Sequence, residues 1–333
     1  MMRVARRIGW AVFVVWATVS IAFLVNHVLP SDPARMVAGQ QAPPDAVARI
    51  RQELELDRPI YVQYARFFRR LVHTGPSSFS PKDRQHGTCT NVGPLHFDLG
   101  RSYQQRRPVV TILSERAPRT FLLAISAAIV QALIGITAGV IAAVKKRRLA
   151  DRLAVGLSLL GVSAPTFVIG LFLQWLFAFK WRLFPIDGFG TTVAEHALSL
   201  VLPAVTLGVF GAAYYTRIVR DEMIGELSHD YVRTARAKGL GRTAIVIRHA
   251  LRNAMMPIVT IFGLEVGTLV GGAIVTESVF RWPGIGSLSV DAMLDRDGPV
   301  IMGCVVVTSL VVVLSTLAVD LAYAVLDPRV RRT

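Results

Sequence analysis

The sequence predicts an all-α integral membrane protein whose chain crosses the bilayer six times. Of its 333 residues, 53% are hydrophobic and only 18% are charged, a composition too apolar for an ordinary soluble domain. The apolar residues gather in runs, each long enough for a helix of about 20 residues to cross the hydrocarbon. The basic residues gather in short segments beside these runs.

The distribution of the basic residues predicts the orientation of the chain. Nineteen Lys and Arg lie in four short segments, with six acids in or beside them, so these segments hold +13 of the net charge of +15. The segments are Arg3–Arg7, Lys145–Arg152, Arg217–Arg252 and Arg329–Arg332. Because short basic segments beside apolar spans stay in the cytoplasm, we expect both termini there. No basic face with interleaved aromatic residues indicates a nucleic-acid partner.

The first span is expected at Ile8–Leu29, within residues 1–29. Its apolar run of 22 residues exceeds the core of about 7–15 residues in a cleaved secretory signal, so we expect an uncleaved helix. The other spans are expected at Thr120–Val144, Leu153–Phe179, Ala197–Tyr215, Ile258–Val279 and Pro299–Val325. Pro165 should kink the third span. Gly135 and Gly139 give the second span a small-residue face for close helix packing.

Residues 30–119 form a long polar segment, which we expect outside the cell as a cap on the bundle. Helical spacing predicts short helices over Asp45–Leu56 and Ile60–Leu71, and Gly and Pro make about residues 74–96 a loop. His73, His86, Cys89 and His96 surround this loop. Their spacing matches no metal signature, so no metal site is expected. Residues 120–325 are the five-helix core with a cytoplasmic loop at 217–257, and residues 326–333 are a cytoplasmic tail.

The cytoplasmic loop contains the most distinctive stretch, Asp230–Pro257, which reads DYVRTARAKGLGRTAIVIRHALRNAMMP. On a helical wheel Tyr231, Val232, Ala235 and Gly239 fall within an arc of about 100°. Gly239 and Gly241 then break the helix. These features predict a short amphipathic helix whose small-residue face docks into a groove of a partner protein.

This stretch resembles the cytoplasmic loop of permease subunits of binding-protein-dependent ABC importers, most closely the peptide type. The wider superfamily has Glu-Ala-Ala, three residues and Gly, where this chain has Arg233, Thr234, Ala235 and Gly239. TARAKG followed by RHALRNAMMP resembles the version of the dipeptide and oligopeptide permeases. The similarity extends to LDRPIYVQYARF (Leu56–Phe67), DLGRSY (Asp98–Tyr103), GGAIVTESVFRWPGIG (Gly271–Gly286) and DPRVR (Asp327–Arg331).

The resemblance implies a fold, partners and a coupling site. The fold is that of a type I importer permease in the bacterial plasma (inner) membrane. The partners are a second homologous permease, two cytoplasmic ATPase subunits that bind ATP and Mg, an external substrate-binding protein and the lipid bilayer. The residues implied in coupling to the ATPase are Tyr231, Arg233, Thr234, Ala235, Arg236, Ala237, Lys238 and Gly239.

Three acids lie in the predicted spans, where a charge is costly and usually faces a cavity or a partner. Glu265 and Glu277 are candidates for the translocation path, although an interfacial hydrogen bond also explains Glu277. Asp320, near the inner end of the last span, is better explained as an interfacial residue.

No nucleotide-binding or catalytic motif appears. The sequence contains no Gly-x-x-x-x-Gly-Lys-Ser/Thr, so ATP hydrolysis is expected on another subunit and no cofactor on this chain. One alternative is a secondary transporter driven by an ion gradient, with Glu265 and Asp320 as carriers, but no inverted repeat supports it. A second is an ABC importer of nickel, glutathione or oligosaccharide. A membrane-embedded enzyme lacks any catalytic constellation.

Overall fold

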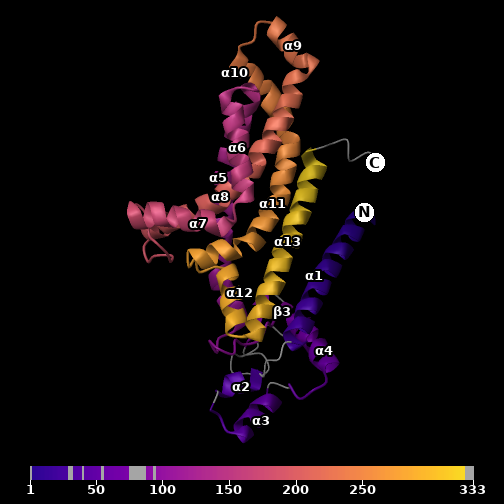
Figure 1. The fold of residues 1–333 in the computed structure, drawn as a ribbon. Coiled ribbons are helices and arrows are strands. Elements are labelled where there is room, and N and C mark those ends of the chain that lie inside the picture. The colour runs from indigo at the N-terminus through magenta and orange to yellow at the C-terminus, as the bar shows by residue number, and fades with distance from the viewer. Residues whose placement is uncertain are drawn as a thin grey trace. The chain divides into compact units, whose positions relative to one another are not determined.

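The computed structural model describes residues 2–28, 33–39, 41–53, 56–74, 88–92 and 95–326 (Figure 1). For most of residues 256–272, and for 319–326, it describes the helical backbone and not the side chains. The chain divides into two compact units. One comprises Met1–Pro118 and Gly284–Val313, and the other Arg119–Pro283 and Leu314–Thr333.

The first unit contains the N-terminal helix and the polar segment that follows it. Its helices are α1 (Met2–Val28), α2 (Pro33–Ala38), α3 (Pro44–Glu53), α4 (Ile60–Leu71), α12 (Ile285–Leu294) and the first parts of α5 (Val109–Val144) and α13 (Gly298–Leu326). The structure confirms the two short helices predicted here, α3 and α4. Aromatic side chains of α4 pack on α1, where Phe23 lies 5.4 Å from the ring of Tyr64 and 5.8 Å from that of Phe67.

A small sheet corrects the two ends of the loop predicted at about 74–96. Strands β1 (His73–Thr74), β2 (Thr90–Val92) and β3 (Leu95–Phe97) pair antiparallel in the order β1-β3-β2. Strands of two or three residues are too short for a periodic pattern, and the pairing of β1 with β3 joins residues distant in sequence. Residues 75–87 and 93–94, with His86 among them, lie outside the described residues.

The DLGRSY motif is held to the turn before α13 by a buried carboxylate. The hydroxyl of Ser102 donates to Asp297, and the backbone N–H groups of Tyr103 and Gln104 donate to its oxygens at 3.1 and 3.2 Å. Burial without partners would be costly for a charge, so these donors make the buried site of Asp297 tolerable. The apolar core beside it joins the start of α5 to α12 and α13.

The second unit is a helical bundle with a bent pair. It contains the rest of α5, α6 (Leu149–Ser163), α7 (Thr166–Leu173), η1 (Gln174–Lys180), α8 (Val193–Ser228), α9 (Asp230–Ala237), α10 (Arg242–Ala244), η2 (Ile245–Leu251) and α11 (Arg252–Val279). The end of α6 and the start of α7 flank Pro165, and the two helical segments are bent by 105°. The predicted break at Pro165 is therefore confirmed, and it is far sharper than a kink.

Among the described residues, four helices are long and apolar enough to cross a membrane, and the bent pair makes a fifth if it forms one span. They are Arg6–Asn26, Val109–Val144, Val193–Ser228 and Gly298–Ala318, and the pair joins Leu149–Ser163 to Thr166–Lys180. These match the predicted first, second, fourth, sixth and third spans. The predicted fifth span lies in α11, whose backbone is helical.

Two helices extend well beyond their predicted spans. α5 begins at Val109 and accommodates Pro118, and α8 continues to Ser228. Hydropathy marks only the apolar part of a helix, so the polar turns at these ends were not included in the prediction.

Glycines allow α5 and α8 to approach closely, as the small-residue face predicted. A Cβ atom on Gly135 would lie 2.5 Å from that of Tyr215, and one on Gly139 would lie 2.6 Å from that of Val219. On α8, a Cβ atom on Gly208 would lie 2.6 Å from Val130. These separations are too short for any side chain, so the packing of the two helices requires glycine at these positions.

Candidate functional site

The helix α9 lies at one end of the second unit, beyond the ends of α5 and α6 (Figure 1). It follows α8 after a single residue, His229. The N–H of Gly239 donates to the carbonyl of Arg236, and the N–H of Leu240 donates to the carbonyl of Ala235. This pair of bonds is the Schellman arrangement, which needs a left-handed residue after the helix. Gly239, with φ +78°, supplies this conformation, and the predicted end of the helix at this glycine is confirmed.

The buried face of α9 corrects the predicted docking face. Val232 and Ala235 are buried against Ile245 of the same chain. Tyr231 is half-buried, and its hydroxyl donates to Glu226 at 2.6 Å. Burial, together with this bond, raises the pKa of Tyr231. The arc of Tyr231, Val232 and Ala235 therefore packs inward, because apolar side chains on so short a helix are covered first by their own chain.

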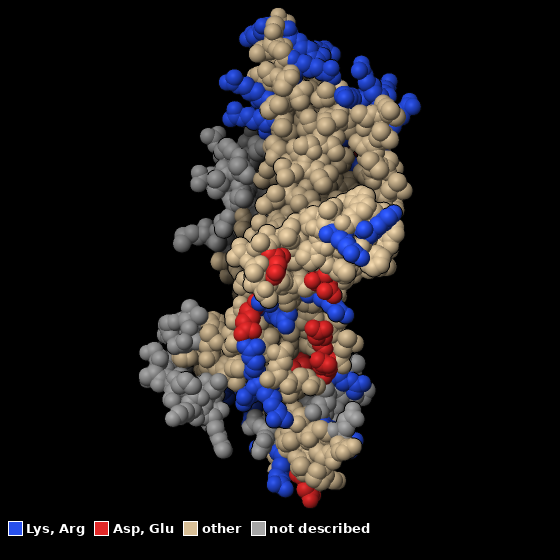
Figure 2. Space-filling model, turned by 90° about the vertical axis from the view of Figure 1, so that its left-hand side faces the viewer, with Lys and Arg blue, Asp and Glu red and all other residues tan. Residues whose placement is uncertain are grey.

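The exposed face of α9 is basic. The residues that face outward are Arg233, Thr234, Arg236, Ala237, Lys238 and Gly239. Only Asp230, whose carboxylate lies 3.6 Å from the guanidinium of Arg233, adds an acid to this face. Figure 2 shows Lys and Arg side chains gathered at this end of the unit. Such a surface is suited to an acidic partner or to anionic lipid headgroups.

Of the two candidates for the translocation path, the structure describes the side chain of Glu277 but not that of Glu265. Glu277 is fully buried at the end of α11, and the hydroxyl of Thr120 on α5 donates to it at 2.8 Å. A role on the path would therefore require a conformational change that exposes it. Glu265 lies on the helical backbone of α11, and its side chain, like that of Asp320, is outside the described residues. The path role of Glu265 and Glu277 stays a prediction.

Aromatic side chains close the core beside Glu277. The indole N–H of Trp282 donates to the carbonyl of Arg119 at 3.1 Å. The ring of Phe189 lies edge-on to Trp282 and beneath the guanidinium of Arg119, 4.7 Å from its carbon. Trp282 of the TESVFRWPG motif, just after α11, therefore packs against α5 and the segment before α8.

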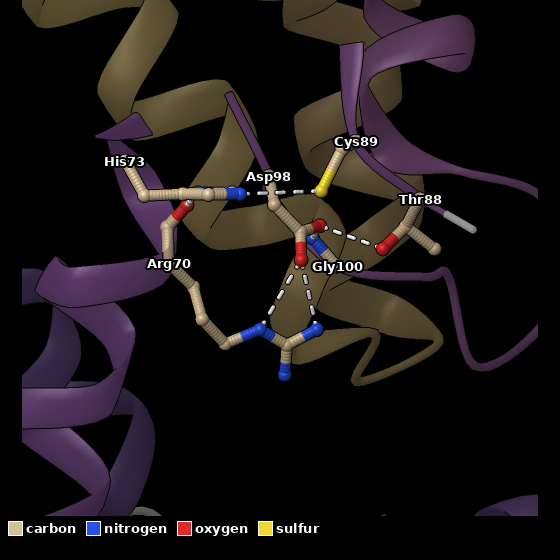
Figure 3. Close-up of polar contacts among 6 residues, drawn as sticks. All are labelled: Arg70, His73, Thr88, Cys89, Asp98 and Gly100. Carbon is tan, nitrogen blue, oxygen red and sulfur yellow. Dashed lines mark hydrogen bonds and ion pairs between the residues drawn. The ribbon is translucent and has the colours of Figure 1, made fainter. Parts of the chain in front are cut away.

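In the polar segment, Asp98 directly follows β3 and bonds to residues of α4 and of the segments that flank the sheet (Figure 3). Its carboxylate accepts two bonds from Arg70, at 3.1 and 2.9 Å, one from the Thr88 hydroxyl and one from the N–H of Gly100, both at 2.8 Å. An almost fully buried carboxylate with four donors is well satisfied. Sequence reasoning noted the DLGRSY motif but did not assign this role to its first residue.

Cys89 lies beside this carboxylate with its sulfur 3.7 Å from Nε2 of His73 (Figure 3). Burial, and then the charge of Asp98, raise the pKa of the Cys89 thiol. The rings of His73 and His96 stack at 5.5 Å. Among the described residues, no three His, Cys, Asp or Glu side chains are placed to hold a metal ion.

Comparison with known proteins decides the family. Residues 135–332 match the binding-protein-dependent transport system inner membrane component, and residues 1–124 match its N-terminal membrane component. The chain belongs to this family.

Relatives and a solved structure agree with this membership. The chain is 39% identical to the glutathione transport system permease protein GsiC of Salmonella paratyphi A, over 93% of this chain and 92% of the relative. It is 36% identical to the dipeptide transport system permease protein DppB of Escherichia coli K12, over 98% of both chains. The MetNI methionine ABC transporter, in an inward-facing conformation, matches with a TM-score of 0.55 at 18% identity. The match covers 66% of this chain and 98% of that chain, and it shows the fold alone.

The chain is therefore a peptide-type permease subunit of an ABC importer, with the type I importer permease fold. It is not an enzyme by itself, because the ATPase of these importers is on other chains. The family membership also removes the alternative of an ion-gradient-driven secondary transporter.

The inward packing of Ala235 can be tested by comparing the same substitution at Ala235 and at the exposed Ala237. Replacing Ala235 by Trp should overpack its contact with Ile245 and destabilise the isolated subunit by about 1–3 kcal/mol. Replacing Ala237 by Trp adds the same side chain to the exposed face and should leave the stability of the subunit unchanged. Thermal unfolding of the purified subunit, without other subunits, measures both. Equal stabilities would contradict the packing described for α9.

Proposed function

We propose that this chain lines the translocation path of an importer for short peptides, including di- and oligopeptides and glutathione. The observation that carries the proposal is the similarity, over more than nine-tenths of the chain, to permeases named for dipeptide and glutathione transport. Both substrates are short chains of amino acids with a free amino group and carboxylate groups. A second homologous permease would complete the path, and an external binding protein would deliver the peptide.

The exposed face of α9 is the proposed contact with a cytoplasmic ATPase. Arg233, Thr234, Arg236, Ala237, Lys238 and Gly239 would meet the partner, whereas Tyr231 and Ala235 would support them from within. Two ATPase subunits, which bind ATP and Mg, would drive the transport cycle. ATP shifts the equilibrium between two conformations only through contacts that differ between them, and α9 is the proposed site of those contacts.

The substrate is tested by uptake in cells with and without this chain. We expect deletion of its gene to abolish ATP-dependent uptake of radiolabelled dialanine, trialanine or reduced glutathione, and the restored gene to recover it. Uptake of a free amino acid such as proline serves as the control for general loss of transport. Loss of nickel or oligosaccharide uptake with peptide uptake intact would contradict the peptide assignment. Uptake that persists without ATP and collapses with the proton gradient would contradict ATP coupling.

The orientation we propose places both termini in the cytoplasm of a bacterial cell and Cys89 outside the plasma membrane. A membrane-impermeant maleimide should label Cys89 in spheroplasts, with Cys89→Ser as the control. Because the pKa of the thiol is raised, less thiolate is present at neutral pH, so labelling should be slow at pH 7 and faster as the pH rises. Labelling that begins only after the membrane is broken, at any pH, would reverse the orientation.

A further inference from the structure

The covalent link between α9 and the helices that follow it contains two glycines. Gly239 and Gly241 flank Leu240, and a Cβ atom added at either glycine would contact nothing within 4 Å. A glycine link of this kind permits many backbone conformations and does not by itself transmit a displacement. Contacts of neighbouring side chains must therefore determine what a movement of α9 does to the rest of the bundle.

Arg242, the first residue after this link, reaches across to α5. Its guanidinium donates to the carbonyl of Val144 at 2.9 Å, between residues 98 apart in sequence. Val144 is the last residue of α5, so its carbonyl has no partner within the helix. A cation at a helix C-terminus is also favoured by the helix dipole. Arg242 therefore caps α5 from the segment that follows α9.

The end of α5 that Arg242 caps is connected by hydrogen bonds to α6 and, through α6, to α8. The turn after α5 brings the N–H of Arg147 to Asp151 of α6 at 2.7 Å. Asp151, almost fully buried, also accepts two bonds from Arg220 of α8, at 2.5 and 3.1 Å. A bidentate pair of this kind defines both distance and orientation. The end of α5 and the first turn of α6 are thus joined to α8 at Arg220, beside the end of α5 where Arg242 attaches.

Apolar packing supports the same connection. Val246 and Ala250 of η2 share a buried cluster with Ala143 of α5 and with Val219 and Met223 of α8. Close-packed side chains of this kind move together, because separating them would open a void. The polar contact of Arg242 therefore lies beside a core that links the same elements.

We propose that Arg242 is a positioning residue that fastens the segment after α9 to the C-terminus of α5, so that a displacement of α9 moves α5. At the other end of this part of α5, Thr120 contacts the buried Glu277 of α11. α5 would therefore carry the displacement from the cytoplasmic end to the junction around Glu277. This inference rests on the proposed function of α9 and adds the route by which its movement reaches the bundle.

The test compares two arginines close together in sequence. Spin labels at His229→Cys, directly before α9, and Lys146→Cys in the turn after α5 report the separation of the two elements, in a chain with Cys89→Ser and Cys304→Ala. Both labelled positions are exposed. Arg242→Ala removes the cap, Arg242→Lys keeps a donor and the charge, and Arg248→Ala removes an equal charge from an exposed position of η2. Pulsed electron paramagnetic resonance of the purified complex, with and without MgATP and vanadate, gives the distance distributions.

We expect Arg242→Ala to broaden the distribution and to reduce the ATP-dependent change in population by about three- to tenfold, the effect of losing one hydrogen bond from a charged donor at an exposed site. Arg248→Ala should resemble the parent chain, and Arg242→Lys should recover part of the change. A parent-like distribution in Arg242→Ala, or equal broadening in Arg248→Ala, would overturn the inference. Failure of the proposed function is distinguishable, because the parent chain would then purify without ATPase subunits. The width of the distribution without nucleotide would still test the cap.

Discussion

The close contact of α5 with α8 is the constraint on which the second unit depends. In a bilayer no hydrophobic effect drives one apolar helix against another, so the helices gain most from the dispersion contacts of closely packed backbones. Gly135 and Gly139 on α5, with Gly208 and Gly211 on α8, leave room only for the partner helix. The buried cluster of Tyr215, Val219 and Met223 with η2 is built on this contact, and α9 follows directly from α8.

The packed pair of α5 and α8 also determines how α9 is connected to the rest of the second unit. A helix that merely lay on the membrane would lose any displacement in its flexible connections. Here α9 is joined to Ile245 by apolar packing, and the end of α5 is joined to α6 and α8 through hydrogen bonds of Asp151. An outside force on the basic face of α9 is then opposed by packed helices, which respond by shifting together. These contacts are the route by which, under the proposed function, ATP hydrolysis on another chain would move the helices of this one.

The sequence predicts those features that depend on residues close together in the chain, and it does not predict contacts between residues far apart. Apolar runs, the break at Pro165, the small-residue face of α5 and the end of α9 before Gly239 depend on neighbours in sequence, and the structure confirms each. The sheet of the polar segment and the capping bond of Arg242 join residues that are far apart in sequence, so no local pattern predicts them. The face of α9 was assigned wrongly because a helical wheel finds an apolar arc without indicating what covers it. The sequence motifs that contain Asp98 and Trp282 indicate that these segments resemble the family. The hydrogen bonds of the two side chains in the structure show what each residue does.

The exposed face of α9 is proposed to meet a cytoplasmic ATPase, and cross-linking tests this contact most directly. A photoreactive benzoyl-phenylalanine replacing Arg236, which is exposed on α9, should cross-link in the membrane to a subunit that binds ATP. The same probe replacing Leu157, an exposed apolar residue of α6, should not. A cross-link from Arg236 to that subunit, lost when the subunit is deleted, is the result expected. Cross-links from Arg236 only to lipid, in a complex that still transports, would contradict the account.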